Sequence, residues 1–124
     1  MADGRRTTGK MDLNHLHLHV RNLQHAKRFY ESYFQFREHM RHGDILFLRN
    51  ANGFDLALVP DRTPGSFPEW FHFGFRLGSE DAVRKLYRRL IAAGVELEEI
   101  EEYDGYTTFS CEDPDGYAIA VYWA

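Results

Sequence analysis

Two stretches of the chain decide its fold: His15-Leu16-His17-Leu18-His19-Val20 and, in the second half, His72-Phe73-Gly74-Phe75-Arg76-Leu77. In both, large apolar residues occupy every second position, which is the pattern of a strand with one buried and one open face. A helix N-cap residue follows each stretch, Asn22 in the first case and Ser79 in the second, and an amphipathic helical pattern follows each cap. The sequence therefore predicts a strand and then a helix at the start of each half.

The second half of the chain repeats the first. A shift of 57 positions carries the strand, the cap and the helical stripe of the first half onto those of the second, so that His15 falls on His72 and Tyr30 on Tyr87. The last predicted strands match with a shift of 63 positions, which carries residues 56–58 onto residues 119–121. The second copy therefore has six additional residues before its last strand. Repetition of this kind predicts two structural units of the same type.

Each unit is predicted to run strand, helix, strand, strand, strand. The three later strands are expected at residues 37–41, 45–49 and 54–59 in the first unit and at residues 96–101, 106–112 and 117–123 in the second. Because neither unit can cover its sheet alone, we expect both to pack into a single α+β domain. Its two modules would span residues 12–60 and 70–124, and residues 1–11 are predicted to form a disordered tail.

The composition argues against several classes of function. The chain has 124 residues and a net charge of −4, so its field does not attract nucleic acid or an anionic membrane surface. No apolar run approaches the roughly 20 residues that cross a bilayer. Cys111 is the only cysteine, which excludes an internal disulfide and fits a reducing compartment, so we predict a cytoplasmic protein. The strand pattern around Cys111 predicts that its thiol is buried and unreactive.

Three motifs carry a resemblance to a known family. They are the two opening strands, the pair Phe29-Tyr30 in the first helix, and the tail Asp113-Pro114-Asp115-Gly116-Tyr117-Ala118-Ile119-Ala120-Val121-Tyr122-Trp123. With these motifs the chain resembles the vicinal oxygen chelate superfamily, which includes glyoxalase I, bleomycin-resistance proteins, fosfomycin-resistance enzymes and extradiol dioxygenases. The resemblance implies two tandem βαβββ modules whose curled mixed sheet forms a cleft, with the helices outside. It also implies a small-molecule ligand and a homodimer, with modules paired within or between chains.

The resemblance further implies a metal site, and there the chain departs from the family. The family's first and last strands supply two histidines and one or two glutamates to a divalent metal such as Zn, Ni, Mn or Fe. By position the histidines correspond to His15 and His72, whereas Ala57 and Ala120 stand at the glutamate positions. Alanine cannot coordinate a cation, and a catalytic metal usually has three protein ligands. The Leu-Gly-Phe that commonly follows the first helix is also altered, to Phe34-Gln35-Phe36.

Further residues are candidates for the cleft. His17 shares the face of His15, so it could contact an organic ligand or complete a three-histidine metal site with His72. Arg76 shares the face of His72 and could grip a carboxylate or phosphate, and Tyr122 shares the face of Ala120. The expected ligand-binding residues are His17, Arg76, Tyr122, Ala57 and Ala120. No catalytic residue is identified, and an ordinary structural role stays open for each candidate, including His15 and His72 as relics of a lost metal site.

Two functions compete on this basis. The first is a small-molecule-binding protein that holds a partly aromatic ligand beside a degraded metal site, which the two alanines and the 15% of aromatic residues favour. The alternative is a metal-dependent lyase, isomerase or dioxygenase of the glyoxalase type with a rearranged, histidine-based ligand set, which the two histidines favour. A third reading, an interaction module that keeps only the fold, is left open.

Overall fold

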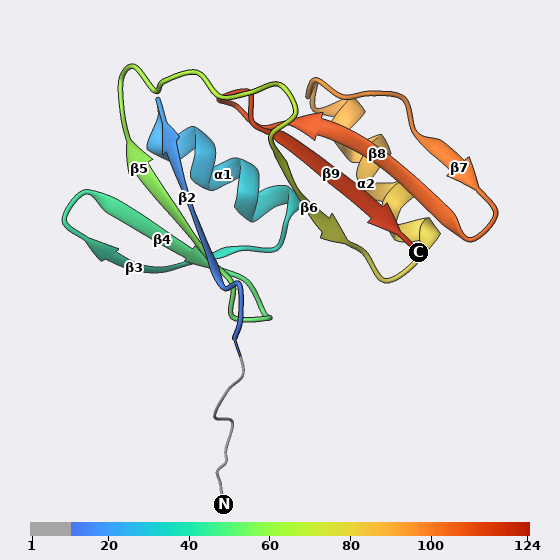
Figure 1. Ribbon diagram of the computed structural model, residues 1–124, viewed down its shortest axis with the longest axis horizontal. Helices are drawn as coiled ribbons and strands as arrows, with labels where there is room; N and C mark the ends of the chain where they lie inside the picture. Colours follow the sequence, from blue (N-terminus) through green and yellow to red (C-terminus); the bar gives the residue numbers. More distant parts are fainter. Residues whose placement is uncertain (1–10) are drawn as a thin grey trace, which may run out of the picture.

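The structure is a computed structural model that describes residues 11–124, and it consists of two βαβββ modules (Figure 1). The first module comprises β2 (His15–Val20), α1 (Leu23–Tyr33), β3 (Arg37–His42), β4 (Ile45–Arg49) and β5 (Asp55–Pro60). The second comprises β6 (His72–Arg76), α2 (Glu80–Ala92), β7 (Glu101–Tyr103), β8 (Tyr106–Glu112) and β9 (Ala118–Trp123). The predicted α+β fold of two modules is confirmed. The predicted disordered tail lies, except for Met11, outside the described residues.

Each module forms its own four-stranded mixed sheet. The strand orders are β2-β5-β4-β3 and β6-β9-β8-β7, and the first strand of each module pairs in parallel with the last. The repeat is confirmed in three dimensions, because a shift of 63 positions carries β5 onto β9 from end to end. A shift of 57 positions carries the first residue of α1 onto the first residue of α2.

Both helices begin at the predicted caps. The Asn22 side chain accepts a hydrogen bond from the backbone N–H of His25 at 3.0 Å, and the Ser79 hydroxyl accepts one from the backbone N–H of Ala82 at 3.1 Å. Each cap satisfies one of the amide groups that a helix leaves unpaired at its start. Gly94 follows α2 with φ +75°, a left-handed conformation that stops the helix and that glycine adopts without strain.

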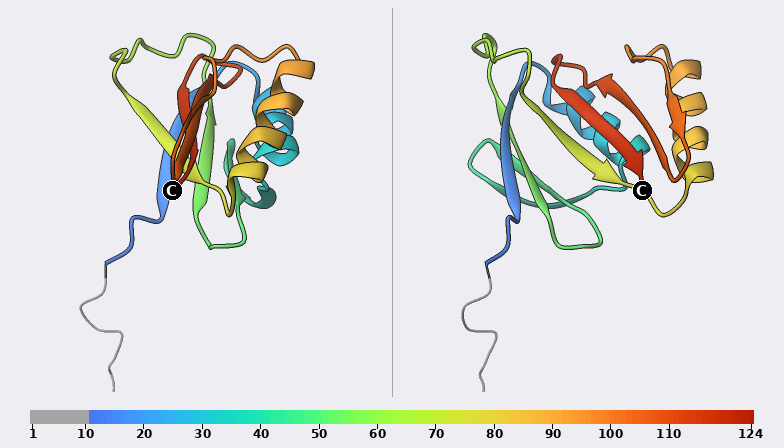
Figure 2. Two further views of the ribbon diagram at one scale, coloured as in Figure 1. Left: turned by 90° about the vertical axis from the view of Figure 1, so that its right-hand side faces the viewer. Right: turned by 45° about the vertical axis from the view of Figure 1, so that its right-hand side comes forward.

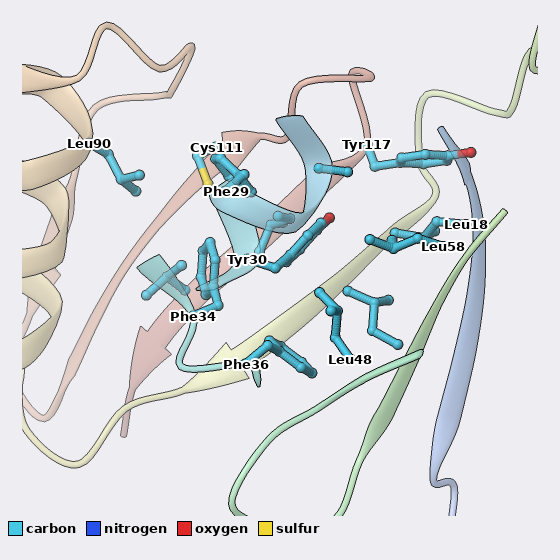
Figure 3. Close-up of a cluster of buried hydrophobic side chains, with 14 of the residues drawn as sticks. Leu18, Phe29, Tyr30, Phe34, Phe36, Leu48, Leu58, Leu90, Cys111 and Tyr117 are labelled. Atoms are coloured by element: carbon cyan, nitrogen blue, oxygen red, sulfur yellow. The ribbon is translucent and has the colours of Figure 1, made fainter. Parts of the chain in front are cut away.

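The helices lie together on one side of the sheets, and the other face of each sheet is open (Figure 2). α1 lies between the two sheets (Figure 1), so its apolar stripe packs against both modules. Phe34, just after α1, stacks on Phe75 of β6 with ring centroids 4.5 Å apart. Figure 3 shows Phe29 and Tyr30 of α1 in the same cluster as Leu48 and Leu58 of the first sheet and Cys111 of the second.

A buried hydrogen bond joins the modules. The Tyr30 hydroxyl donates to Oδ2 of Asp113 at 2.6 Å, while Oδ1 of Asp113 accepts from the backbone N–H groups of Asp115 and Tyr117. Burial raises the pKa of Asp113, although these three hydrogen bonds oppose that rise. The Tyr117 hydroxyl in turn donates to the carbonyl of His19 in the first module, at 2.9 Å. The Asp-Pro-Asp-Gly turn is therefore a buried polar link between the two modules.

The strand predicted at residues 96–101 is wrong. Leu97 forms only an isolated bridge with Cys111, and β7 begins at Glu101, which pairs with Thr108. Leu97 and Glu101 are four positions apart, whereas their partners on β8, Cys111 and Thr108, are three positions apart. The segment therefore contains one additional residue relative to β8, which interrupts the ladder. Leu97 and Ile100 are three positions apart, so the apolar residues of this segment do not follow the two-residue period of a strand.

Cys111 is buried, as predicted, and burial raises the pKa of its thiol to about 12. The reactive thiolate is therefore scarce at neutral pH. Within residues 11–124, neither helix has the length and apolar character needed to span a membrane.

We expect Tyr30→Phe to destabilise the protein by about 1–3 kcal/mol at about pH 7, because it removes a donor from a buried carboxylate. The loss should shrink as the pH falls through the raised pKa of Asp113, since a protonated carboxyl depends less on that donor. Urea unfolding followed by circular dichroism at about pH 7 and about pH 4 measures both effects. Tyr33→Phe, which removes a hydroxyl from a half-buried residue of the same helix, is the control. Equal stability of wild type and Tyr30→Phe at neutral pH would contradict the assigned role.

Candidate functional site

The open face of the first sheet carries the three histidines of β2. His15, His17 and His19 are exposed, and the rings of His15 and His17 lie 6.0 Å apart. The Nδ1 atom of His15 lies 2.9 Å from Oδ1 of Asn14, which can only accept, so Nδ1 carries the proton and Nε2 stays free to accept. The Nδ1 atom of His19 bonds to Asp61 at 2.8 Å, which lowers the pKa of that carboxyl.

Ala57 lies beside His17 on the neighbouring strand. The register pairs Ala57 with His17 of β2 and with Phe47 of β4, whose rings lie 6.5 Å apart. Although it is on the open face, Ala57 is 0% exposed, because these neighbours cover its methyl group. Ala57 is also the diagonal neighbour of His15, since His15 pairs with Asp55. This diagonal is the place from which a carboxylate at position 57 could approach a cation held by His15.

Asp55 is a carboxylate on this face that the sequence analysis missed. It pairs directly with His15, but its two oxygens accept hydrogen bonds from Nε and Nη2 of Arg49 at 2.7 and 3.0 Å. This two-point bond lowers the pKa of Asp55 and occupies both oxygens. Asp55 therefore does not replace the missing glutamate. Its alternation with Ala57 along β5 places it on the open face and was the signal available in the sequence.

The open face of the second sheet carries His72, Gly74 and Arg76, all exposed. The Nδ1 atom of His72 lies 3.1 Å from the carbonyl oxygen of Trp70, so Nε2 is again free to accept. Gly74 pairs with Ala120, and a Cβ atom on Gly74 would lie 3.0 Å from the Ala120 carbonyl oxygen. The backbones are therefore close at this point, which only glycine allows without displacement. Arg76 pairs with Tyr122 and donates from Nη2 to the carbonyl of Ala124 at 2.7 Å.

A row of three tyrosines continues from Arg76 across the same face. Tyr122 of β9 lies 6.4 Å from Tyr106 of β8, and Tyr106 stacks on Tyr103 of β7 with centroids 6.0 Å apart. Tyr103 is 57% exposed and Tyr106 40% exposed, so both rings present a surface to solvent. We call Tyr103, Tyr106 and Tyr122 the tyrosine row. The sequence analysis identified only Tyr122, although Tyr106 also alternates with the buried residues Thr107 and Phe109.

A cleft of about 740 Å³ separates the first sheet from β6. His72 and Arg76 line one side, together with Gly74, while Asn14 and Leu16 of the first module line the other. Phe36 and Phe75 provide apolar walls. The other expected site residues lie on the open faces outside this lining: His15, His17, Ala57, Ala120 and Tyr122. That these residues bind a ligand stays a prediction.

The residues present do not fit a catalytic metal centre within one chain. His15 and His72 each offer a free Nε2 atom, but the neighbouring positions that would add a carboxylate are Ala57 and Ala120. Across residues 11–124, no three His, Cys, Asp or Glu side chains lie close enough together to hold a metal ion. A centre with two imidazoles and no anionic ligand lacks both the ligand number and the charge that such metals prefer.

Several solved structures share this fold. A possible glyoxalase from Bacillus cereus is 32% identical, with a TM-score of 0.79 over 90% of this chain and 98% of that chain. A fosfomycin resistance protein from Listeria monocytogenes is 20% identical, with a TM-score of 0.81 over 93% of this chain and 94% of that one. A lactoylglutathione lyase from Agrobacterium tumefaciens is 17% identical, with a TM-score of 0.72 over 94% and 96%. At 20% and 17% identity, the fosfomycin resistance protein and the lactoylglutathione lyase show only that the fold is shared.

The sequence comparisons point the same way. No curated protein matches the chain. The model of one family matches residues 12–121, which is nearly the whole of the described chain. On this match, and on the 32% identity to the Bacillus cereus protein, the chain belongs to the glyoxalase/bleomycin resistance protein/dioxygenase superfamily.

Proposed function

We propose that the protein binds a partly aromatic small molecule between its modules and on their open faces, without a catalytic metal. The observation that carries this proposal is the pair of alanines, Ala57 and Ala120, diagonal to the histidines that open each module. Neither alanine can give its histidine a carboxylate ligand for a divalent cation, and Asp55, which pairs with His15, is bound by Arg49. The open faces of the sheets therefore present imidazoles that can form hydrogen bonds but, among the described residues, no group of side chains that would bind a cation tightly.

The tyrosine row supports an aromatic ligand. Aromatic rings gain about 0.5–1.5 kcal/mol from stacking beyond the area that they bury. Tyr106 and Tyr122 present such rings next to Arg76, whose guanidinium would hold a carboxylate or phosphate on the same molecule. The free Nε2 atoms of His15 and His72 would accept hydrogen bonds from its hydroxyl or amide groups. In this proposal the two modules recognise different parts of one ligand.

We also propose that the working form is a cytoplasmic homodimer. The cleft opens on the apolar side chains of Leu16, Phe73 and Phe75, which a second copy would cover. Pairing between chains would also bring the β2 histidines of one copy toward the second module of the other. The metal-dependent alternative then requires His15 and His72 to meet in the assembled protein, and their free Nε2 atoms are the observation in its favour.

The neutral fluorescent probe N-phenyl-1-naphthylamine tests the aromatic site. We expect Tyr106→Ala to weaken its binding about fivefold to tenfold, because a stacking surface worth roughly 1 kcal/mol is lost. Tyr106→Phe, which keeps the ring, is the matched control and should change affinity less than twofold. The double variant His15→Ala/His72→Ala should lose no more than about tenfold, because only hydrogen bonds between neutral groups are removed. A hundredfold loss in that double variant, together with loss of a bound metal, would reject the proposal.

Restoring the carboxylates tests the lost metal site. The double variant Ala57→Glu/Ala120→Glu should gain tight binding of Zn²⁺ or Ni²⁺, and a hundredfold excess of metal over its dissociation constant should stabilise it by about 2.7 kcal/mol. Adding His72→Ala to this variant should remove the gain. Wild type should show no thermal stabilisation by Zn²⁺, Ni²⁺, Mn²⁺ or Fe²⁺. Wild-type protein that is purified without chelator and carries a full equivalent of such a metal would favour the enzyme instead.

A further inference from the structure

A second pocket lies beside the helices, and none of the three residues of the tyrosine row lines it. Its volume is about 420 Å³, and it is bounded by the end of α1, the turn at residues 50–52, the end of β6 and the face of α2. Three cationic side chains line it: Arg76, Lys85 and Arg89. We call it the basic pocket. It shares Asn50, Asn52, Phe75 and Arg76 with the cleft, but Lys85 and Arg89 line the basic pocket and not the cleft.

The charge of the basic pocket is not balanced by the chain. No Asp or Glu occurs among its lining residues, although the whole chain has a net charge of −4. Arg84, on the same helix, forms ion pairs with Glu80, Asp81 and Glu102. Within residues 11–124, by contrast, no ion pair within 4.0 Å involves Lys85 or Arg89, whereas Arg76 donates to the Ala124 oxygen at 2.7 Å. Three cations around one hollow repel one another, so an anion placed among them is favoured.

The cations are arranged for contact with a ligand. Lys85 and Arg89 are one helical turn apart on α2 and therefore lie on the same face. Nη2 of Arg89 donates to the backbone carbonyl of Ser32 at 2.8 Å, and its guanidinium carbon lies 5.2 Å from the centre of the Tyr33 ring. A carbonyl partner fixes the orientation of the guanidinium without neutralising its charge, and it leaves other N–H groups free to donate.

The remaining walls are apolar. The stacked rings of Phe34 and Phe75 form one wall, and Leu86 of α2 forms another. Ala82, one turn before Leu86 on the same side of α2, has only a methyl group and leaves space beside Lys85. A ligand that fills this pocket therefore needs an apolar or aromatic body as well as a charged group.

Gln35 gives an independent indication that this pocket has a role. Its φ is +62°, and it is the only described residue other than glycine with a positive φ. The corresponding stop after α2 uses Gly94, which adopts φ +75° without strain. The glutamine side chain lines the basic pocket, where its amide adds a donor and an acceptor. A strained conformation retained next to a pocket is a reason to infer a function for the side chain.

We propose that the basic pocket binds a small organic anion, a carboxylate or phosphate monoester with an aromatic or aliphatic body. Its anionic group lies between Lys85 and Arg89 and accepts a hydrogen bond from Gln35, and its body packs on Phe34 and Phe75. Lys85, Arg89 and Gln35, which hold the anionic group here, do not line the cleft, so either site can exist without the other.

Phenyl phosphate and benzoate are suitable probes of the two anionic groups. In ¹H–¹⁵N spectra of the full chain, at least one of them should shift the signals of Lys85, Arg89 and Gln35 and leave those of Tyr106 and Tyr122 in place. Lys85→Gln and Arg89→Gln should each weaken binding at least tenfold by titration calorimetry. Lys27→Gln, which removes a cation from α1 that is already paired with Glu31 and Glu38, is the matched control and should change affinity less than twofold.

Gln35→Gly separates binding from stability. Relief of the left-handed strain should raise the melting temperature by a few degrees, whereas loss of the amide should weaken phenyl phosphate several-fold. Benzyl alcohol, which lacks the charge, should bind at least tenfold more weakly than phenyl phosphate. Equal affinity of wild type and Lys85→Gln for both anions, or shifts confined to the tyrosine row, would overturn the proposal. Inorganic phosphate that binds as tightly as phenyl phosphate would overturn the assignment of the apolar walls.

Discussion

The bond between the Tyr30 hydroxyl and the Asp113 carboxylate is the interaction on which the rest of the structure depends. It is buried, and it fastens the central helix of the first module to the turn that starts the last strand of the second. A buried carboxylate is costly unless every oxygen is satisfied, and Asp113 meets this requirement with two backbone donors in addition to Tyr30. Any displacement of α1 relative to the turn would therefore break a satisfied network.

The hydrogen bond between Tyr30 and Asp113 also determines the geometry of the candidate functional surfaces. The turn fixes where β9 begins, and the register of β9 against β6 then places Ala120 beside Gly74 and Tyr122 beside Arg76. On the helix side, α1 and α2 are joined through Arg89 and the Ser32 carbonyl, which sets the width of the basic pocket. A shift of one module against the other would thus change the cleft and the basic pocket together.

The sequence determined the fold well because its signals are local. Alternation along residues 15–20 and 72–76, the caps at Asn22 and Ser79, and the repeat are all visible without tertiary information, and each was confirmed. The predicted strand at residues 96–101 was wrong because its register depends on the partner strand, and Leu97 and Ile100, three positions apart, do not define a strand face. The candidate site was harder to predict from the sequence for the same reason. Its features depend on residues that the fold brings together across strands and modules. These features are the hydrogen bonds between Asp55 and Arg49, the burial of Ala57 beneath His17 and Phe47, and the proximity of Lys85, Arg89 and Gln35.

The two modules share a backbone plan but differ where a ligand would meet them. The first sheet presents imidazoles and the Asp55–Arg49 pair, whereas the second presents the tyrosine row. The turn glycines Gly43 and Gly105 are 62 positions apart, so five of the six additional residues of the second copy precede the turn of its β7–β8 hairpin, which carries Tyr103 and Tyr106. Likewise the left-handed stop after each helix is glycine in one module and a strained glutamine in the other. Folding alone requires neither difference, because in each case the other module forms the same structure without the additional residues or without the strained conformation. The departures from the repeat therefore coincide with the surfaces that carry aromatic rings or unbalanced charge, which is where selection for binding, rather than for stability, would act.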